Sequence, residues 1–190
     1  IGTGANGAID LASVVTLAAL TTTGAIDLDH AADAAVTVTA LTTAAGAIQL
    51  DQTGNQTLNV QVATTGNGNI TLTNAGGTNA DVTLGAVTAD QLNDVVTVTA
   101  SGSLNANAIN PGAEITAATI TLKADDGGIG QGANGALDID ATVALNADVS
   151  ADVAAAAISI DDIAGNLPIG VITADLDGTV TLTSAGTILD

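Results

Sequence analysis

Aspartate pairs are the residues of this chain best suited to chemistry. Residues two apart on a β-strand lie on one face, so a D-x-D pair would present two carboxylates together. Asp29 and Asp51 are also 22 residues apart, and stacking at that spacing would place like charges about 5 Å apart. Such oxygen-rich positions suit calcium, so Asp27, Asp29 and Asp51 are the candidate ligands of a Ca²⁺ ion. The alternative is that these carboxylates are solvated and keep the protein soluble. The D-x-D pairs are Asp27 with Asp29, Asp138 with Asp140, and Asp175 with Asp177.

Paired carboxylates can also act as general acid and base, as in enzymes that cleave polysaccharides. The adjacent pairs are Asp125 with Asp126 and Asp161 with Asp162. The chain has no aromatic residue on which a sugar ring could stack, and no Cys or Arg for a nucleophile or an anion clamp. We expect its single histidine, His30, to be a solvated turn residue. These observations predict a protein without catalytic residues that is not an enzyme.

The opening segment IGTGANGAIDL contains a G-x-G-x-x-G pattern at Gly2, Gly4 and Gly7, with Asp27 and Asp29 beyond it. In dinucleotide-binding sites, a strand precedes these glycines and a helix N-terminus binds the phosphates. The residues that follow here, AIDLASVVTLAAL, have the alternation and β-branched residues of a strand. The pattern therefore predicts turn glycines and no nucleotide cofactor.

Threonines recur in Thr-x-Thr pairs along the chain. On a flat solenoid face, ranks of threonine at strand spacing can order water in an ice-like lattice. Threonine is also the ordinary outward residue of a strand, because it is β-branched. Thr39 lies 22 residues before Gln61, so the expected rank is interrupted. The pairs are Thr37 with Thr39, Thr71 with Thr73, Thr97 with Thr99, Thr119 with Thr121, and Thr181 with Thr183.

Composition limits the fold and the partners. Of the 190 residues, 47% are hydrophobic, yet none is Phe, Tyr, Trp, Met or Cys, so the interior must be narrow and aliphatic. The formal charge is −19, with Lys123 the single basic residue, and this disfavours nucleic acid and anionic membranes as partners. Nearly all of the acids are aspartates, which suit turns rather than helices. No apolar stretch reaches the length needed to span a bilayer.

A short repeat is the strongest signal in the sequence. The pentapeptide GAIDL at Gly24 returns as GAIQL at Gly46 and as GNITL at Gly68, each 22 residues apart. A constant period in the twenties indicates a solenoid, with Ile26, Ile48 and Ile70 stacked in its interior. We predict an all-β fold, a right-handed parallel β-solenoid (β-helix) with coils of about 22 residues. The register loosens after Leu84, and NAGGTNAD and AINPGAEIT are expected to be loops or insertions between coils.

A longer repeat lies over the short one. IGTGANGAIDLASVVTL at Ile1 returns as IGQGANGALDIDATVAL at Ile129, with ten of seventeen positions identical. The glycine motif therefore marks turns within a repeated unit of the chain. We expect residues 1–190 to form a single solenoid segment of a longer repetitive protein.

Three segments carry a family resemblance: GNITLTNAGG from Gly68, VTVTASGSLNANAI from Val96 and GTVTLTSAGTI from Gly178. They resemble coils of filamentous-haemagglutinin-type bacterial surface adhesins, which are right-handed parallel β-helices. The resemblance implies an elongated, extracellular, cell-surface protein with an adhesive or scaffolding role.

The expected function is therefore that of a non-enzymatic extracellular structural or adhesive β-solenoid, a segment of a surface filament. Both Ile1 to Leu11 and Gly178 to Leu189 have strand-like patterns, which predicts self-association end to end. The other expected partner is a cell-surface glycan or another surface receptor. The alternative function is a calcium-dependent glycan-binding or ice-binding adhesin module.

Overall fold

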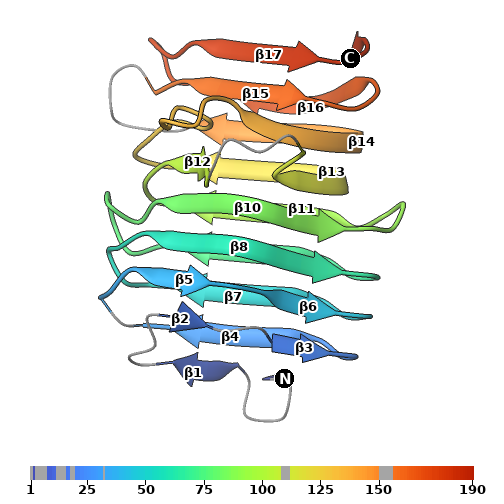
Figure 1. The fold of residues 1–190 in the computed structure, drawn as a ribbon. Coiled ribbons are helices and arrows are strands. Elements are labelled where there is room, and N and C mark those ends of the chain that lie inside the picture. Colours follow the sequence, from blue (N-terminus) through green and yellow to red (C-terminus); the bar gives the residue numbers. More distant parts are fainter. Residues whose placement is uncertain are drawn as a thin grey trace.

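The computed structural model describes residues 2, 8–11, 16–17, 20–31, 33–107, 112–149 and 156–190. Their secondary structure is entirely β, with 18 strands hydrogen-bonded into one sheet that winds around the molecule. Parallel coils of about 23 residues stack into a β-solenoid of about seven turns, with the two ends of the chain at opposite ends of the stack (Figure 1). The predicted all-β parallel β-solenoid is confirmed.

Each coil contributes strands to two ladders, which we call the first and the second ladder. In the first ladder, Ile26 pairs with Ile48, and Ile48 pairs with Ile70. The first ladder contains β1 (Ile9–Leu11), β4 (Ile26–His30), β7 (Ile48–Gln52), β9 (Ile70–Asn74), β11 (Val95–Ala100), the second halves of β13 (Ile115–Ala124) and β14 (Leu137–Val149), β16 (Leu167–Thr173) and β18 (Ile188–Leu189).

The second ladder completes each coil. Its strands β5 and β6 in one coil correspond to the single longer strand β8 in the next. In Figure 1, β5, β8, β10, β15 and β17 lie one above another and point the same way. The second ladder contains β2 (Thr16–Leu17), β3 (Leu20–Thr22), β5 (Val36–Val38), β6 (Leu41–Thr43), β8 (Leu58–Thr65), β10 (Val82–Ala89), β12 (Leu104–Ala106), the first halves of β13 and β14, β15 (Ile158–Asp162) and β17 (Val180–Ser184).

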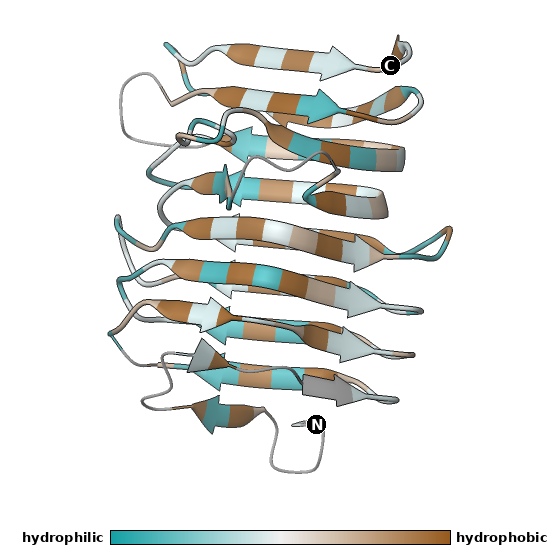
Figure 2. Ribbon diagram, viewed as in Figure 1, coloured by the Kyte–Doolittle hydropathy of each residue, from teal (hydrophilic) through white to brown (hydrophobic). Residues whose placement is uncertain are grey.

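Alternating side chains build the core. Along β4, β7 and β9 the first, third and fifth residues are buried and the second and fourth are not. Figure 2 shows the corresponding alternation of hydrophobic and hydrophilic residues along many strands of the stack. Ile26, Ile48 and Ile70 are all buried and in register, as predicted. Burial of each such side chain stabilises the fold by about 1.5–3 kcal/mol, so the columns are its main source of stability.

Corners interrupt the alternation within the longer strands. Two successive residues, Gln61 and Val62, face away from the core in β8, and Gly85 and Ala86 do the same in β10. The chain bends there, and beyond the bend every second side chain again faces the core. A side chain at Gly85 would collide with the carbonyl oxygen of Gln61 in the coil below, so glycine is needed at this bend.

The predicted constant period holds for only part of the stack. It holds from Ile26 to Ile48 to Ile70, but the next steps of the first ladder, to Val96 and then to Ile120, are both longer. Stacking fixes only the strands, so the extra residues lie in turns such as 75–81, which includes most of the predicted NAGGTNAD loop. Pro111 of the other predicted loop lies outside the described residues.

The long repeat is a structural repeat as well. Gly2 and Gly130 both have positive φ, of 75° and 66°, and a side chain at either would collide with a carbonyl oxygen of the next coil. In the second copy, Gly132 to Gly135 form a turn closed by a hydrogen bond of 3.1 Å. This confirms the turn interpretation there, whereas residues 3–7 of the first copy lie outside the described residues.

The two copies occupy different ladders. Ile9 of the first copy pairs with Leu28 in the first ladder, whereas the matching Leu137 pairs with Ile160 in the second. The offset from Ile1 to Ile129, at about 23 residues per coil, corresponds to about five and a half coils. The described residues of the two copies therefore lie on different faces of the solenoid.

Candidate functional site

An outward column of aspartates is the strongest candidate site. Asp29 lies in register between Asp10 and Asp51, and the column continues to Thr73. Asp27 lies two positions earlier on the same strand and pairs with Gln49, whose Nε2 donates to Asp51 Oδ2 at 2.7 Å. The structure thus brings Asp29 and Asp51 together as predicted, and it adds Asp10. Sequence reasoning missed Asp10 because the step from β1 to β4 is shorter than the step from β4 to β7, on which the repeat was based.

The electrostatics of this column follow from like charges held in register. Partial loss of hydration raises the pKa of Asp29, and the charges of Asp51, Asp10 and Asp27 raise it further. Beside the column is a hollow of about 340 Å³ that His30, Ala31 and Thr53 also line. Within the described part of the chain, no three acidic, histidine or cysteine side chains lie close enough to hold a metal ion together. The arrangement suits a hydrated cation between two carboxylates better than a closed cage.

His30 is buried, with an exposed fraction of 1%, so its interpretation as a solvated turn residue is wrong. The side chain is the fifth residue of β4, and the strand alternation turns it inward. It stacks in register on Gln52, which stacks on Asn74, and both of these are also buried. Asn74 Nδ2 donates to the carbonyl oxygens of Gln56 and Asp81, both at 2.8 Å. The hydrogen bonds of this internal polar column hold the adjacent turns in place. The column could have been found in the sequence, because its three polar residues recur at the spacing of the short repeat.

Asp161 and Asp162 do not converge. They are neighbours on β15, so their side chains face opposite sides of the sheet. Asp161 Oδ1 accepts a hydrogen bond from the Thr183 hydroxyl, and Asp162 is buried beside Ser184. This pair therefore does not place two carboxyl groups on opposite sides of one bound group, as general acid and base catalysis would require. Of the other pair, Asp125 forms an ion pair of 2.7 Å with Lys123.

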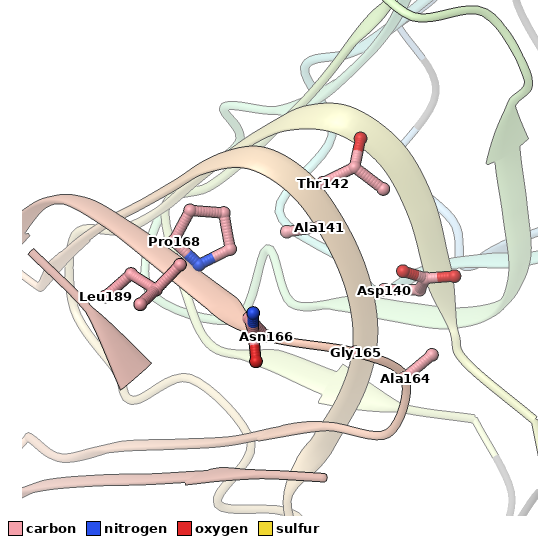
Figure 3. A pocket seen from close by; sticks show the side chains of 8 residues that line it. All are labelled: Asp140, Ala141, Thr142, Ala164, Gly165, Asn166, Pro168 and Leu189. Atoms are coloured by element: carbon pink, nitrogen blue, oxygen red, sulfur yellow. The ribbon is translucent and has the colours of Figure 1, made fainter. Parts of the chain in front are cut away.

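A hollow lies near the C-terminal end, where Asp140 and Thr142 face Pro168 and Leu189 (Figure 3). Its volume is about 400 Å³, and Asp140 is the only ionisable residue among those that line it. A smaller neighbouring hollow of about 230 Å³ shares Asp140 and Thr142 and reaches Leu92. A single carboxylate in an open, mostly apolar hollow supplies a contact but no acid and base pair.

Threonines do form outward ranks. Thr71 pairs with Thr97, which pairs with Thr121, while the parallel rank runs from Thr73 through Thr99 to Lys123. The rank that starts at Thr71 therefore covers three coils, whereas the rank that starts at Thr73 covers two and ends at Lys123.

Side-chain oxygens cap backbone N–H groups of the following coil at many corners. Asn69 Oδ1 accepts from the Val95 amide at 3.0 Å, and Asp81 Oδ1 accepts from the Ser103 amide at 2.7 Å. The same contact is made by Asn55, Glu114, Asn146 and Asn166. These contacts give a structural role to four asparagines and to Asp81, because a corner breaks the strand ladder and would leave its N–H groups without partners.

Glu114 is the most buried member of this group, with an exposed fraction of 1%. Its Oε2 accepts a hydrogen bond from the Asp138 amide at 2.7 Å. Burial raises the pKa of Glu114 from 4.5 to about 7, and the Asp138 charge adds to the rise while the backbone hydrogen bond opposes it. Sequence reasoning did not identify this position, although Glu114 is the only glutamate in the chain.

Comparisons with protein-family models, with curated proteins and with solved structures found no match. Among the described residues, no helix is long and apolar enough to cross a membrane.

Glu114 should make the stability of the folded protein depend on pH. The folded state binds its proton more tightly than the unfolded chain, so its contribution to stability is greatest below pH 4.5 and is lost as the pH rises toward 7. Glu114→Gln should therefore raise the free energy of unfolding at pH 8 by about 2 kcal/mol and flatten its pH dependence, as measured by urea unfolding from pH 5 to 8. Asp90→Asn removes the same charge from an exposed position and serves as the control. Parallel pH profiles for Glu114→Gln and the wild type would contradict this account.

Proposed function

We propose that this chain is a non-enzymatic structural or adhesive segment of an extracellular surface filament. The observation that carries the proposal is the unbroken stack of parallel coils around aliphatic columns. The described strands of each coil are hydrogen-bonded to strands of the neighbouring coils, so bending or stretching the solenoid would break many hydrogen bonds together. A stiff solenoid of this kind is suited to a structural element that bridges two points at a distance.

The charge distribution supports an extended filament over a lateral aggregate. The chain carries 20 acidic residues and one basic residue, Lys123, which is already paired with Asp125. Two solenoids side by side would therefore repel each other, whereas electrostatic repulsion would oppose contact between their ends less strongly. The resemblance of several coils to filamentous-haemagglutinin-type adhesins supports a location at the cell surface, where a glycan would be the partner of an adhesive segment.

Electron microscopy of the purified protein tests the proposal. We expect fibres of constant width, one solenoid across, whose number increases with salt because screening reduces the repulsion between acidic segments. Sedimentation velocity should show the same increase in mass. Compact monomers at all protein and salt concentrations would contradict the filament proposal.

A second candidate function is a calcium-dependent glycan-binding or ice-binding module. Partial loss of hydration and then the neighbouring carboxylates raise the pKa of Asp29, and a bound cation would relieve the repulsion between these carboxylates, which supports the calcium form. The threonine array on β9, β11 and β13 supports its ice-binding form.

Calcium titration separates this candidate from the first. If an ion bridges Asp29 and Asp51, calcium should raise the melting temperature by several degrees, and Asp51→Asn should abolish that rise. Asp148→Asn is a matched control on the same outward face, several coils away. An equal effect of calcium on all three proteins would indicate charge screening and would contradict a specific site.

A further inference from the structure

One corner of the solenoid forms a notch. The chain uses six residues, 89–94, to turn this corner in the coil of β10 and β11, but only two, 117–118, in the next coil and three, 141–143, in the coil after that. In the following coil a loop, 163–166, again separates two strands, β15 and β16. The short corners are therefore recessed between two loops, and Figure 1 shows the loop after β10 extending beyond the stack. The columns that bound the corner are Thr88–Thr116–Asp140 and Val95–Thr119–Ala144.

Two hollows occupy this notch and adjoin at Asp140 and Thr142, which line both of them. The smaller hollow, of about 230 Å³, lies between the loop after β10 and the corner at 117–118. The larger, of about 400 Å³, lies between Asp140 and Thr142 on one side and Pro168 on the other (Figure 3). Sites for small molecules typically have volumes of about 300–1,000 Å³, so the notch has room for a short oligomeric ligand.

Hydrogen bonds hold both walls of the notch in place. Asp94, which is 7% exposed, lies in the loop after β10. Its Oδ2 accepts hydrogen bonds from the Gly68 amide at 3.0 Å and from the Gln91 amide at 3.3 Å. On the other wall, Asn166 Oδ1 accepts a hydrogen bond from the Thr187 amide at 2.9 Å. Walls that are fixed before a ligand arrives lower the entropic cost of binding it.

The polar side chains of the notch offer both donors and acceptors. Asn166 uses its side-chain oxygen within its own wall, which leaves its Nδ2 as a donor, and Gln91 supplies a second amide group. Asp140 and Thr142 supply carboxylate oxygens and a hydroxyl where the two hollows adjoin. Within the part of the chain that the structure describes, neither of these two side chains forms a hydrogen bond. Their hydrogen-bonding capacity is therefore available to a ligand.

Apolar surface lies beside these polar groups. Leu92, with an exposed fraction of 83%, lines the smaller hollow, and Pro168 lines the larger. Although the chain has no aromatic residue, the C–H groups of a sugar ring can pack against such aliphatic side chains.

The charge and the donors of the notch together favour a neutral ligand. Asp90 and Asp140 are the ionisable residues among those that line the two hollows, so an anion would be repelled. A cation or a basic peptide would pair with these carboxylates but would leave the amide donors unmatched. Sugar hydroxyls match both sets, because each hydroxyl donates one hydrogen bond and accepts others.

We infer that this notch binds a neutral oligosaccharide, with Asp140 and Thr142 contacting the sugar hydroxyls at its centre. This inference rests on the proposed adhesive function and identifies the place and the chemistry of its glycan contact. Binding here needs no metal ion, which distinguishes it from calcium-dependent binding at the aspartate column.

Glycan binding by matched variants tests the notch. The protein is applied to immobilised neutral hexasaccharides of glucose, mannose, galactose and N-acetylglucosamine, and the retained saccharide is then titrated by calorimetry in the presence of EDTA. We expect Asp140→Ala to weaken binding by about tenfold or more, because hydrogen bonds to a charged group are strong. Asp148→Ala removes a carboxylate from the same strand outside both hollows and should leave the affinity unchanged.

A second pair of variants tests the apolar surface. Leu92 and Val171 are both exposed, at 83% and 68%, but of the two only Leu92 lines a hollow. Leu92→Ser should therefore weaken binding several-fold, whereas Val171→Ser should not change it. Thermal unfolding checks that each variant remains folded.

The possible failures are distinguishable. A saccharide that binds Asp140→Ala and Leu92→Ser as tightly as the wild type would overturn the notch but leave an adhesive function through another surface. Retention of a hexalysine peptide in place of every saccharide would overturn the inference in favour of a cationic partner. If the wild type retained none of the saccharides, both the notch and the glycan contact would be overturned, while electron microscopy would still decide the filament proposal.

Discussion

The parallel hydrogen-bond register between coils is the constraint on which the rest of this structure depends. It places each residue directly beside the residue at the same position of the next coil. Side chains at matching positions must therefore pack well against one another. Ile26, Ile48 and Ile70 meet this condition by forming a continuous aliphatic column. The absence of aromatic residues follows, since narrow coils stacked about 4.8 Å apart are filled by Val, Leu and Ile.

The same register makes charge unfavourable on the outer face. Asp138 lies beside Asp161, and burial together with that neighbour raises its pKa, as burial and like charges do for Asp29. Lys123 is the exception, because it lies in register with Asp148 and is paired with Asp125. At the corners the ladder is broken, and there side-chain oxygens replace the missing strand partners. The acidic and amide residues of this chain thus have two roles, solvation on the flat faces and capping at the bends.

Features that follow from the coil-to-coil register could be predicted from the sequence, whereas features that do not follow from it were missed. The short GAIDL repeat was sufficient for the fold class, the stacked columns and the proximity of Asp29 and Asp51. The corners within β8 and β10 could not be predicted, because a bend adds one outward residue without changing composition. The inward position of His30 depended on where β4 ends, and the burial of Glu114 depended on a contact with the coil of Asp138. The constant period failed after Ile70 because turns vary in length while strands do not.

Coil-to-coil register can be measured directly because the chain has no native cysteine. Thr71 and Thr97 are outward residues paired in adjacent coils, and Thr121 follows in the coil after that. Adjacent parallel strands lie about 4.8 Å apart, within the range that a disulfide can bridge, whereas two coils are about twice as far. Oxidation of the double variant Thr71→Cys with Thr97→Cys should therefore give an intramolecular disulfide, detected by mass spectrometry, and Thr71→Cys with Thr121→Cys should give none. A free thiol pair in the first variant, or equal cross-linking in both, would contradict the stacked register.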